Sequence, residues 1–252
     1  MKTRYFIFLS YKGTSYHGWQ VQPDSPTVQE TLEKSLSLLL GEKIETTGAG
    51  RTDAGVHASF FCAHFDSSVL NLQNDKNLKF RLNRFLPKDI SVNDIRKVRH
   101  DANARFSALS RTYKYYISTV KDPFKEDLSW FLYGELDLQI MNLASDELLK
   151  HTDFTSFSRL HTDVKTNNCR IFAAEWTREG PMLVFTIRAD RFLRNMVRAI
   201  VGTMVDAGRG KISPSMFAGI IASRNRSSAG ISAPAKGLFL TDIEYPPEVF
   251  LK

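Results

Sequence analysis

The chain has 252 residues, 42% of them hydrophobic and 24% charged, with a net charge of +7 and a pI near 9.4. This composition is that of a folded protein with one large domain or two small ones, and it excludes disorder over most of the length. The excess of positive charge favours a polyanionic partner, and a generally basic surface without such a partner is the alternative.

The cysteines and the N-terminal segment indicate the compartment. Cys62 and Cys169 lie in opposite halves of the chain, which favours a reducing environment over a disulfide framework. The apolar run at residues 5–9 is too short for a signal peptide or a membrane span, and it predicts a buried strand. We therefore expect a cytoplasmic protein that does not enter a membrane.

A helix is predicted after this strand, from apolar residues at helical spacing: Val28, Leu32, Leu36 and Leu39. Two starts are open. Pro26 suits a first helical position after a Ser25 cap, whereas Thr27 and Glu30 form a rival capping box. Gly41 is suited to end the helix.

The rest of the first half continues the alternation. Strands are predicted at residues 42–47, 58–65 and 90–98, and Leu78, Leu82 and Phe85 mark a second helix that Pro87 stops. The order βαββαβ is the ferredoxin-like pattern that RNA-recognition modules also use.

The second half has a similar pattern but no matching residues. It predicts a strand at 111–119, a helix at 138–149, a hairpin at 169–189 that turns at 179–181, a helix after Asp190, a shorter helix at 214–223 and a last strand at 237–245. The chain is therefore expected to be an α+β protein of two halves with mainly antiparallel sheets, divided into domains 1–104 and 105–252.

The stretch GAGRTDAGVHA, at residues 48–58, is the first candidate site. A dinucleotide fingerprint fits Gly48 and Gly50, but Asp53 stands where its third glycine belongs, and the Gly-Lys-Ser/Thr of a P-loop is missing. His57, Cys62 and His64 match no common zinc spacing. Neither a cofactor nor a metal is predicted here.

Asp53 then remains as a lone carboxylate on a glycine-rich turn. Such an aspartate often does no more than bond to its own backbone. The neighbouring Arg51 favours an ionised carboxylate, and the glycines would let a polymer backbone approach closely.

Two further stretches combine cations with apolar residues. In RFLRNMVRAIVGTMVDAG, Arg191, Arg194 and Arg198 flank an apolar stripe, made of Leu193, Met196, Val197, Ile200, Val201, Met204 and Val205. The three arginines either line a cleft or form a solvated basic face. In FSALSRTYKYY, cations alternate with the aromatic residues Phe106, Tyr113, Tyr115 and Tyr116, which stack on RNA bases or fill the core.

These stretches bear a family resemblance. GRTDAGVHA resembles the signature of the tRNA pseudouridine synthases that modify uridines 38 to 40 of the anticodon stem-loop. YKGTSYHGWQ, RFSALSRTYKYY, DFTSFS at 153–158, RFLRNMVRAIVG and AKGLFL resemble further landmarks in the family's order, so the likeness covers nearly the whole chain. One departure is Lys12, where the family commonly has aspartate.

The resemblance implies a cofactor-free and metal-free isomerase that detaches uracil from N1 and rejoins it through C5. It implies that Asp53 is the catalytic aspartate, that Tyr113 stacks on the target uracil, that Arg198 pairs with the aspartate and that Arg51 helps to extrude the base. It also implies two ferredoxin-like halves around a central basic cleft, a homodimer and a tRNA partner. Attack of Asp53 on C1′, attack on C6 and removal of a 2′ proton all remain open.

Two rival functions compete with this one. The first is a catalytically silent RNA-binding protein on the same scaffold, which would not need Asp53 together with Arg198. The second is a metal-assisted nuclease, for which the chain lacks clustered carboxylates.

Overall fold

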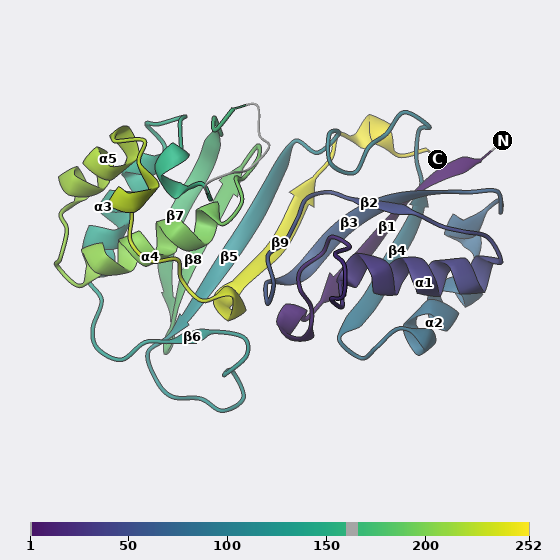
Figure 1. Ribbon diagram of the computed structural model, residues 1–252, viewed down its shortest axis with the longest axis horizontal. Coiled ribbons are helices and arrows are strands. Elements are labelled where there is room, and N and C mark those ends of the chain that lie inside the picture. Colours follow the sequence, from purple (N-terminus) through teal and green to yellow (C-terminus); the bar gives the residue numbers. More distant parts are fainter. Residues whose placement is uncertain (1, 160–165, 252) are drawn as a thin grey trace. The chain divides into compact units, whose positions relative to one another are not determined.

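The structure is a computed structural model that describes residues 2–159 and 166–251 (Figure 1). The chain forms two compact units: the first is Met1–Leu109 with Leu240–Lys252, and the second is Ser110–Phe239. These units are not the same segments as the expected domains 1–104 and 105–252. The main difference is that the chain from Leu240 onward returns to the first unit.

The first unit contains, in chain order, β1 (Thr3–Tyr11), α1 (Val28–Leu40), β2 (Thr46–Gly48), β3 (His57–Ser67), α2 (Lys76–Phe85) and β4 (Ile90–Lys97). β1 pairs antiparallel with β3 and with β4, and β2 pairs antiparallel with β3. The last strand, β9 (Leu238–Glu244), also neighbours β3. The helices α1 and α2 lie side by side, and α2 packs on β4 (Figure 1).

Local sequence explains where α1 begins and ends. The Thr27 side chain accepts a hydrogen bond from the Glu30 N–H at 3.3 Å, so the second of the two expected starts is the correct one. Gly41 ends the helix in a left-handed conformation with φ of 68°. The strand expected at residues 42–47 is shorter than predicted, because β2 begins only at Thr46.

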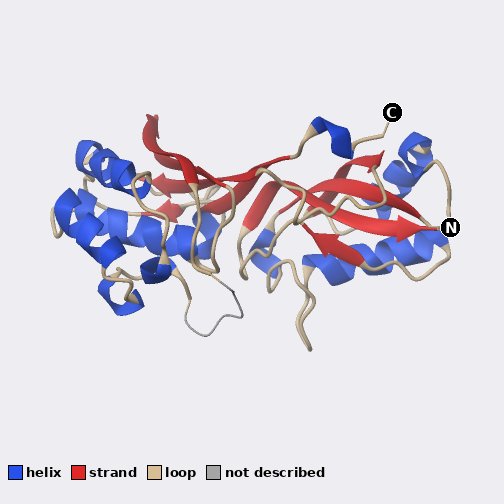
Figure 2. Cartoon of the chain, turned by 90° about the horizontal axis from the view of Figure 1, so that it is seen from above, coloured by secondary structure: helices blue, strands red, loops and turns tan. Residues whose placement is uncertain are grey.

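The second unit contains β5 (Ser110–Ser118), β6 (Trp130–Phe131), α3 (Leu138–Leu148), β7 (Ile171–Glu179), β8 (Met182–Ala189), α4 (Met196–Gly208) and α5 (Pro214–Ala222). β8 pairs antiparallel with β5 and β7, and Gly180, with φ of 59°, turns the expected hairpin. The three helices pack on one another and α3 packs on β7 (Figure 2).

The apolar stripe predicted along α4 is buried, from Leu193 to Val205. The sequence predicted that this helix starts directly after Asp190, but it begins later, at Met196. Asn195 has φ of 65°, a left-handed conformation that a right-handed helix does not continue through, so the first helical residue is Met196.

The fold is therefore α+β with mostly antiparallel strand pairing, as predicted. Cys62 and Cys169 are both free thiols and both buried. Within residues 2–159 and 166–251, the helices are all too short or too polar to cross a membrane.

His64, on β3, is a buried titratable group of the first unit. Only 7% of its surface is exposed, and its Nδ1 accepts a hydrogen bond from the Ala104 N–H at 3.1 Å. Burial, followed by the charge of Arg4, lowers the pKa of His64 to about 4 from an ordinary 6.5. The unfolded chain therefore binds this proton more readily than the folded one. The resulting stability is fully present above pH 6.5 and is lost as the pH falls toward 4.

We expect His64→Asn to weaken this pH dependence. Asn keeps a hydrogen-bond acceptor near the position of Nδ1 but does not titrate. Between pH 6.5 and 4, the free energy of unfolding of the wild type should fall by about 2–3 kcal/mol more than that of the variant. Urea unfolding at several pH values measures this difference, and any constant offset from altered packing cancels. Parallel curves for the two proteins would contradict the prediction.

Candidate active site

Asp53 lies on a loop between β2 and β3, at residues 49–56, which we name the aspartate loop. Its carboxylate side chain is half-buried, and the neighbouring Arg51 is exposed. The Val56 N–H donates to the Asp53 carbonyl oxygen at 3.1 Å and closes a tight turn. Gly55, inside this turn, has φ of 77°, where a side chain would be strained.

The landmark YKGTSYHGWQ forms the support of the aspartate loop. A Cβ on Gly13 would lie 2.0 Å from the Val56 carbonyl oxygen, and one on Gly18 would lie 2.2 Å from the Thr52 carbonyl oxygen. Only glycine permits both close approaches. The Gly13 N–H also donates to His57 Nδ1 at 2.9 Å. The first landmark therefore fixes the position of the loop that carries Asp53.

Gly48 and Gly50, before Asp53, were both expected to let a polymer backbone approach closely, but their surroundings differ. A Cβ on Gly48 would lie 2.4 Å from Nε1 of Trp19, so this glycine makes room for a buried indole of the protein itself. Trp19 in turn stacks on Phe61, with ring centroids 4.2 Å apart. At Gly50 no atom comes within 4 Å of the Cβ position, so the space beside this glycine is open.

Tyr113, in the second unit, is half-buried on β5. Its ring packs edge-on against Phe192, with centroids 5.1 Å apart and an angle of 86°. Tyr115, on the same face of the strand, is fully buried, and its hydroxyl donates to the Pro234 carbonyl oxygen at 2.8 Å. The core alternative is thus correct for Tyr115.

Arg198 is half-buried on α4, and its direction is set by a backbone segment at residues 229–233, which we name the clamp segment. The Arg198 Nε donates to the Ala233 carbonyl oxygen at 2.7 Å, and the Ala233 N–H donates to the Arg198 carbonyl oxygen at 2.9 Å. One turn further along α4, a Cβ on Gly202 would lie 1.8 Å from the Ile231 carbonyl oxygen. The clamp segment reaches α4 only because residue 202 is glycine.

The side chains of Asn195 and Arg226 hold the clamp segment and were not predicted from the sequence. Asn195 Nδ2 donates to Ser232 Oγ at 2.6 Å, and Arg226 Nη2 donates to the same oxygen at 3.1 Å. Arg226 Nη1 also donates to the Gly230 carbonyl oxygen at 3.2 Å. Asn195 stands inside the RFLRNMVR landmark, which was the one available signal for it.

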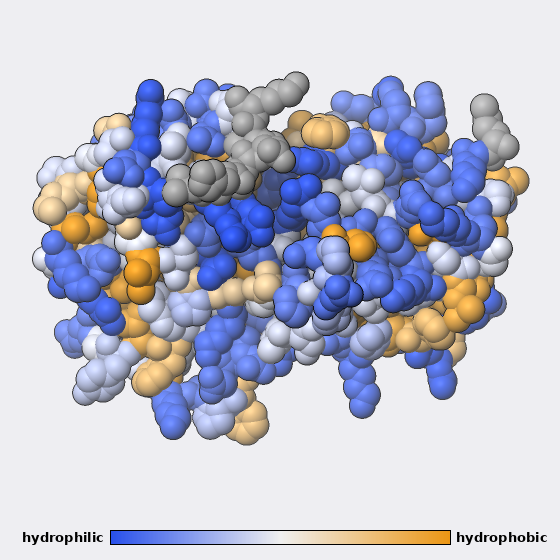
Figure 3. Space-filling view, viewed as in Figure 1, coloured by the Kyte–Doolittle hydropathy of each residue, from blue (hydrophilic) through white to orange (hydrophobic). Residues whose placement is uncertain are grey.

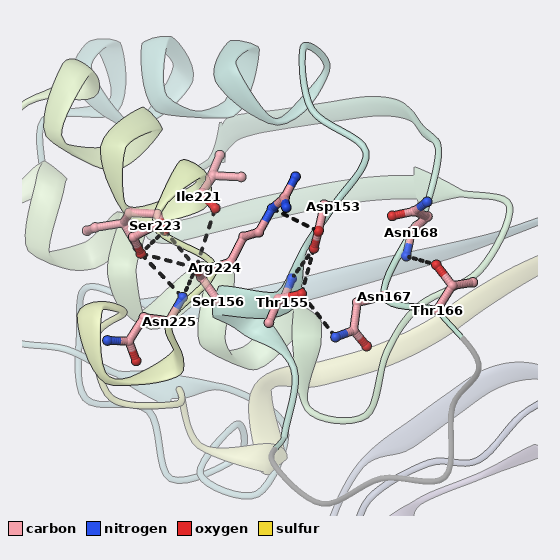
Figure 4. A network of polar contacts seen from close by, with 11 residues as sticks. Asp153, Thr155, Ser156, Thr166, Asn167, Asn168, Ile221, Ser223, Arg224 and Asn225 are labelled. Atoms are coloured by element: carbon pink, nitrogen blue, oxygen red, sulfur yellow. Dashed lines mark hydrogen bonds and ion pairs between the residues drawn. The ribbon is translucent and has the colours of Figure 1, made fainter.

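The landmark DFTSFS is part of a polar network that holds the end of α5 (Figure 4). Arg224 Nε donates to Asp153 Oδ2 at 3.0 Å, and the Thr155 hydroxyl donates to Asp153 Oδ1 at 2.6 Å. The Thr155 hydroxyl, and to a smaller extent Arg224, lowers the pKa of Asp153. Ser156 Oγ accepts from the Asn225 N–H at 3.0 Å. This network fixes the start of the chain that leads through Arg226 to the clamp segment.

The four predicted site residues are divided between the two units. Asp53 and Arg51 share the aspartate loop of the first unit. Tyr113 and Arg198 belong to the second, in which Tyr115 of β5 bonds to Pro234 and Arg198 of α4 bonds to the neighbouring Ala233. Burial raises the pKa of the Tyr115 phenol, and the nearby Arg198 acts in the opposite direction. A carboxylate, an aromatic ring and an oriented guanidinium are each groups that nucleophilic chemistry on an extruded RNA base can use.

Comparisons with known proteins point to one family. A family described as tRNA pseudouridine synthase matches residues 7–107 and 144–246. These ranges include Arg51, Asp53 and Arg198, whereas Tyr113 lies between them. Among similar proteins, the tRNA pseudouridine synthase A of Bacteroides fragilis is 56% identical over 248 residues, which are 98% of each chain.

More distant relatives carry the same name. The protein of Bacteroides thetaiotaomicron is 54% identical over 98% of this chain and 92% of its own. That of Geotalea daltonii is 36% identical over 95% of this chain and 98% of its own. With matches of this extent, and with the family's landmarks accounting for the loop that carries Asp53 and the clamp around Arg198, the chain belongs to the tRNA pseudouridine synthase family.

Proposed function

We propose that this chain is an isomerase that converts uridine to pseudouridine in tRNA, at positions 38, 39 and 40 of the anticodon stem-loop. The observation that carries the proposal is Asp53 on its glycine-fixed loop, in a chain whose relatives over nearly their full length are named tRNA pseudouridine synthase A. The stretch GRTDAGVHA resembles the signature of the synthases that modify uridines 38 to 40, and this likeness supports the anticodon stem-loop as the region modified.

The reaction breaks the bond between C1′ and N1, turns the uracil and forms a bond between C1′ and C5. The C5 hydrogen leaves as a proton and N1 gains one, so there is no net redox change and no hydrolysis. A carboxylate shielded from water meets these requirements without a cofactor. Asp53 is the catalytic residue, and it acts by attack on C1′, by attack on C6 or by removal of a 2′ proton.

The other three residues bind the substrate. The target uridine first leaves its stack, which costs a few kcal/mol. Arg51, exposed on the aspartate loop, offers a cation to the displaced strand, and Tyr113 offers a ring on which the uracil stacks. Arg198 presents a guanidinium whose direction the Ala233 carbonyl sets.

We further propose that each unit is a ferredoxin-like half and that the protein works as a cytoplasmic homodimer. In the first unit, the strand order β4-β1-β3, with β2 paired to β3, supports this architecture. Two buried, unpaired cysteines are in keeping with a reducing compartment. A dimer would extend the basic surface available to a tRNA.

The test is pseudouridine formation in tRNA incubated with the purified protein. Pseudouridine has the mass of uridine, so the product is detected by selective carbodiimide labelling followed by fragmentation of the RNA. We expect labelling at positions 38 to 40, with equal rates in the presence of a chelator. Tight binding of tRNA without any labelled product would favour the silent RNA-binding alternative and overturn the proposal.

Tyr113 offers a residue-level prediction. Tyr113→Leu removes the ring and should lower kcat/KM by about 5- to 150-fold, which corresponds to the usual 1–3 kcal/mol for stacking on one base. Tyr113→Phe keeps the ring, so any loss of turnover in this variant measures the role of the hydroxyl. Tyr116→Leu, on the other face of β5, is the control and should change kcat/KM little. If both Tyr113 variants behave like the wild type, this tyrosine is only part of the core.

A further inference from the structure

Helix α2 carries a concentrated positive charge that the chemistry above does not use. The stretch from Lys76 to Lys88 contains five cationic side chains and no carboxylate, in a chain whose net charge is +7. All five are exposed. We name them, together with Phe80, the α2 basic face: Lys76, Lys79, Arg81, Arg84, Lys88 and Phe80.

Neighbouring carboxylates do little to neutralise this face. Among the described residues, its one ion pair joins Arg81 to Asp75 at the long distance of 3.9 Å. Lys79 Nζ bonds only weakly, at 3.4 Å, to the Asn93 carbonyl oxygen. Elsewhere in the same unit, Lys34 and Lys43 each lie 2.6 Å from a glutamate. Most of the positive charge of the α2 basic face is therefore available to an anionic partner.

The face is also partly aromatic. Phe80 is 61% exposed, and the Arg84 guanidinium lies 5.8 Å from the centre of its ring. Phe85, which the sequence predicted to mark the apolar side of the helix, is 52% exposed, and the neighbouring Leu86 is buried in its place. The surface over this part of the molecule mixes strongly hydrophilic with apolar side chains (Figure 3). The exposed cations suit the phosphates of a nucleic-acid backbone, and the exposed rings add apolar contact area beside them.

The C-terminal end of α2 is connected to the aspartate loop through a short chain of hydrogen bonds. Just beyond α2, the Asp89 carboxylate accepts from the Tyr16 hydroxyl at 2.7 Å, and its carbonyl oxygen accepts from the Lys12 N–H at 2.9 Å. The Tyr16 carbonyl oxygen accepts from the Gly55 N–H of the aspartate loop at 3.2 Å. From this end the helix leads away for about 15 Å, at 1.5 Å per residue.

We propose that the α2 basic face binds the backbone of the tRNA stem that flanks the target uridine. The cations contact stem phosphates, while the nucleotide that is isomerised lies at Asp53. Charge complementarity selects a polyanion, and the direction of α2 away from the aspartate loop selects a part of the RNA other than the reacting nucleotide. This inference rests on the proposed function of the chain.

The test is the triple variant Lys79→Gln/Arg81→Gln/Arg84→Gln. Gln has a helix propensity close to those of Lys and Arg, so α2 should keep its fold, which thermal unfolding checks. We expect the Kd for tRNA to rise about tenfold or more at moderate salt, with kcat at saturating tRNA unchanged. The slope of log Kd against log salt concentration should fall by about two, because phosphate contacts are lost.

The matched control is Lys2→Gln/Lys34→Gln/Lys43→Gln. It removes three cations from the same unit, each already paired with a glutamate, and we expect Kd and the salt slope to stay close to wild type. If both triple variants weaken binding equally, only the total charge matters and the proposal is wrong. Arg81→Lys/Arg84→Lys keeps the charge and should retain the affinity, which would show that positive charge and not the guanidinium itself carries the binding.

Two other outcomes separate the neighbouring hypotheses. If light scattering shows that the α2 triple variant changes the oligomeric state while tRNA affinity is unaltered, the face is a self-association surface and the proposal is overturned. If the wild type forms no pseudouridine but binds tRNA through α2, the binding surface stands and the catalytic function fails.

Discussion

We expect Asp53→Asn to abolish turnover while tRNA binding stays within about twofold of wild type. The amide has nearly the shape of the carboxylate, and it retains the backbone turn that the Val56 N–H closes. It neither attacks carbon nor accepts a proton as a carboxylate does, so the rate should fall at least about a thousandfold. Single-turnover pseudouridine formation at saturating enzyme measures the loss.

Asp24→Asn is the control for this substitution. Asp24 lies on another exposed turn of the first unit, with φ of 54°, a conformation that Asn also tolerates. This variant should keep full turnover, which would show that loss of a negative charge from the unit has no general effect. Retention of even a tenth of the wild-type rate in Asp53→Asn would remove Asp53 from the catalytic role.

The second large effect is expected from Gly202→Ala on α4. The new Cβ would meet the Ile231 carbonyl oxygen at 1.8 Å, a distance at which the clamp segment has to move away from the helix. That movement breaks the hydrogen bond from the Arg198 Nε to the Ala233 carbonyl oxygen. Overpacking of this kind typically costs about 1–3 kcal/mol of stability. We expect a lower midpoint of thermal unfolding together with a fall in kcat/KM.

Gly219→Ala, on α5, makes the same change where there is room for it. No atom lies within 4 Å of its Cβ position, so the alanine should stabilise the helix by about 0.5–1 kcal/mol. The two variants should therefore change stability in opposite directions. Equal stabilisation by both would mean that the clamp segment does not press on α4 at Gly202.

The sequence predicted well the features that depend on neighbouring residues. The cap of α1 at Thr27, the hairpin turn at Gly180 and the buried stripe of α4 all follow from side chains within a few positions of one another. Asp53 could also be proposed from local sequence, because one short stretch contains the carboxylate, its neighbouring arginine and its glycines. Periodicity and turn chemistry act over such distances.

Contacts between distant segments could not be predicted in this way. Gly13 and Gly18 are required by backbone atoms of Val56 and Thr52, and nothing in the first landmark indicates those partners. The same holds for Gly202 and the clamp segment, and for the return of the chain to the first unit from Leu240. A glycine has no side chain and so adds nothing to a periodic pattern. The reason that a position requires glycine is seen only when the backbone packed against it is known.

The way in which the aspartate loop is held has a consequence for kinetics. Its contacts with the first landmark include backbone hydrogen bonds, a hydrogen bond between the Tyr11 and Thr52 hydroxyls, and close packing at Gly13 and Gly18. Mobile ions screen interactions between exposed charges, but they leave neutral contacts of this kind almost unchanged. We therefore expect ionic strength to act mainly on the encounter with the RNA, because these neutral contacts keep the aspartate loop in place. Once a tRNA is seated, the rate of isomerisation in the bound complex should change far less with salt than the affinity does.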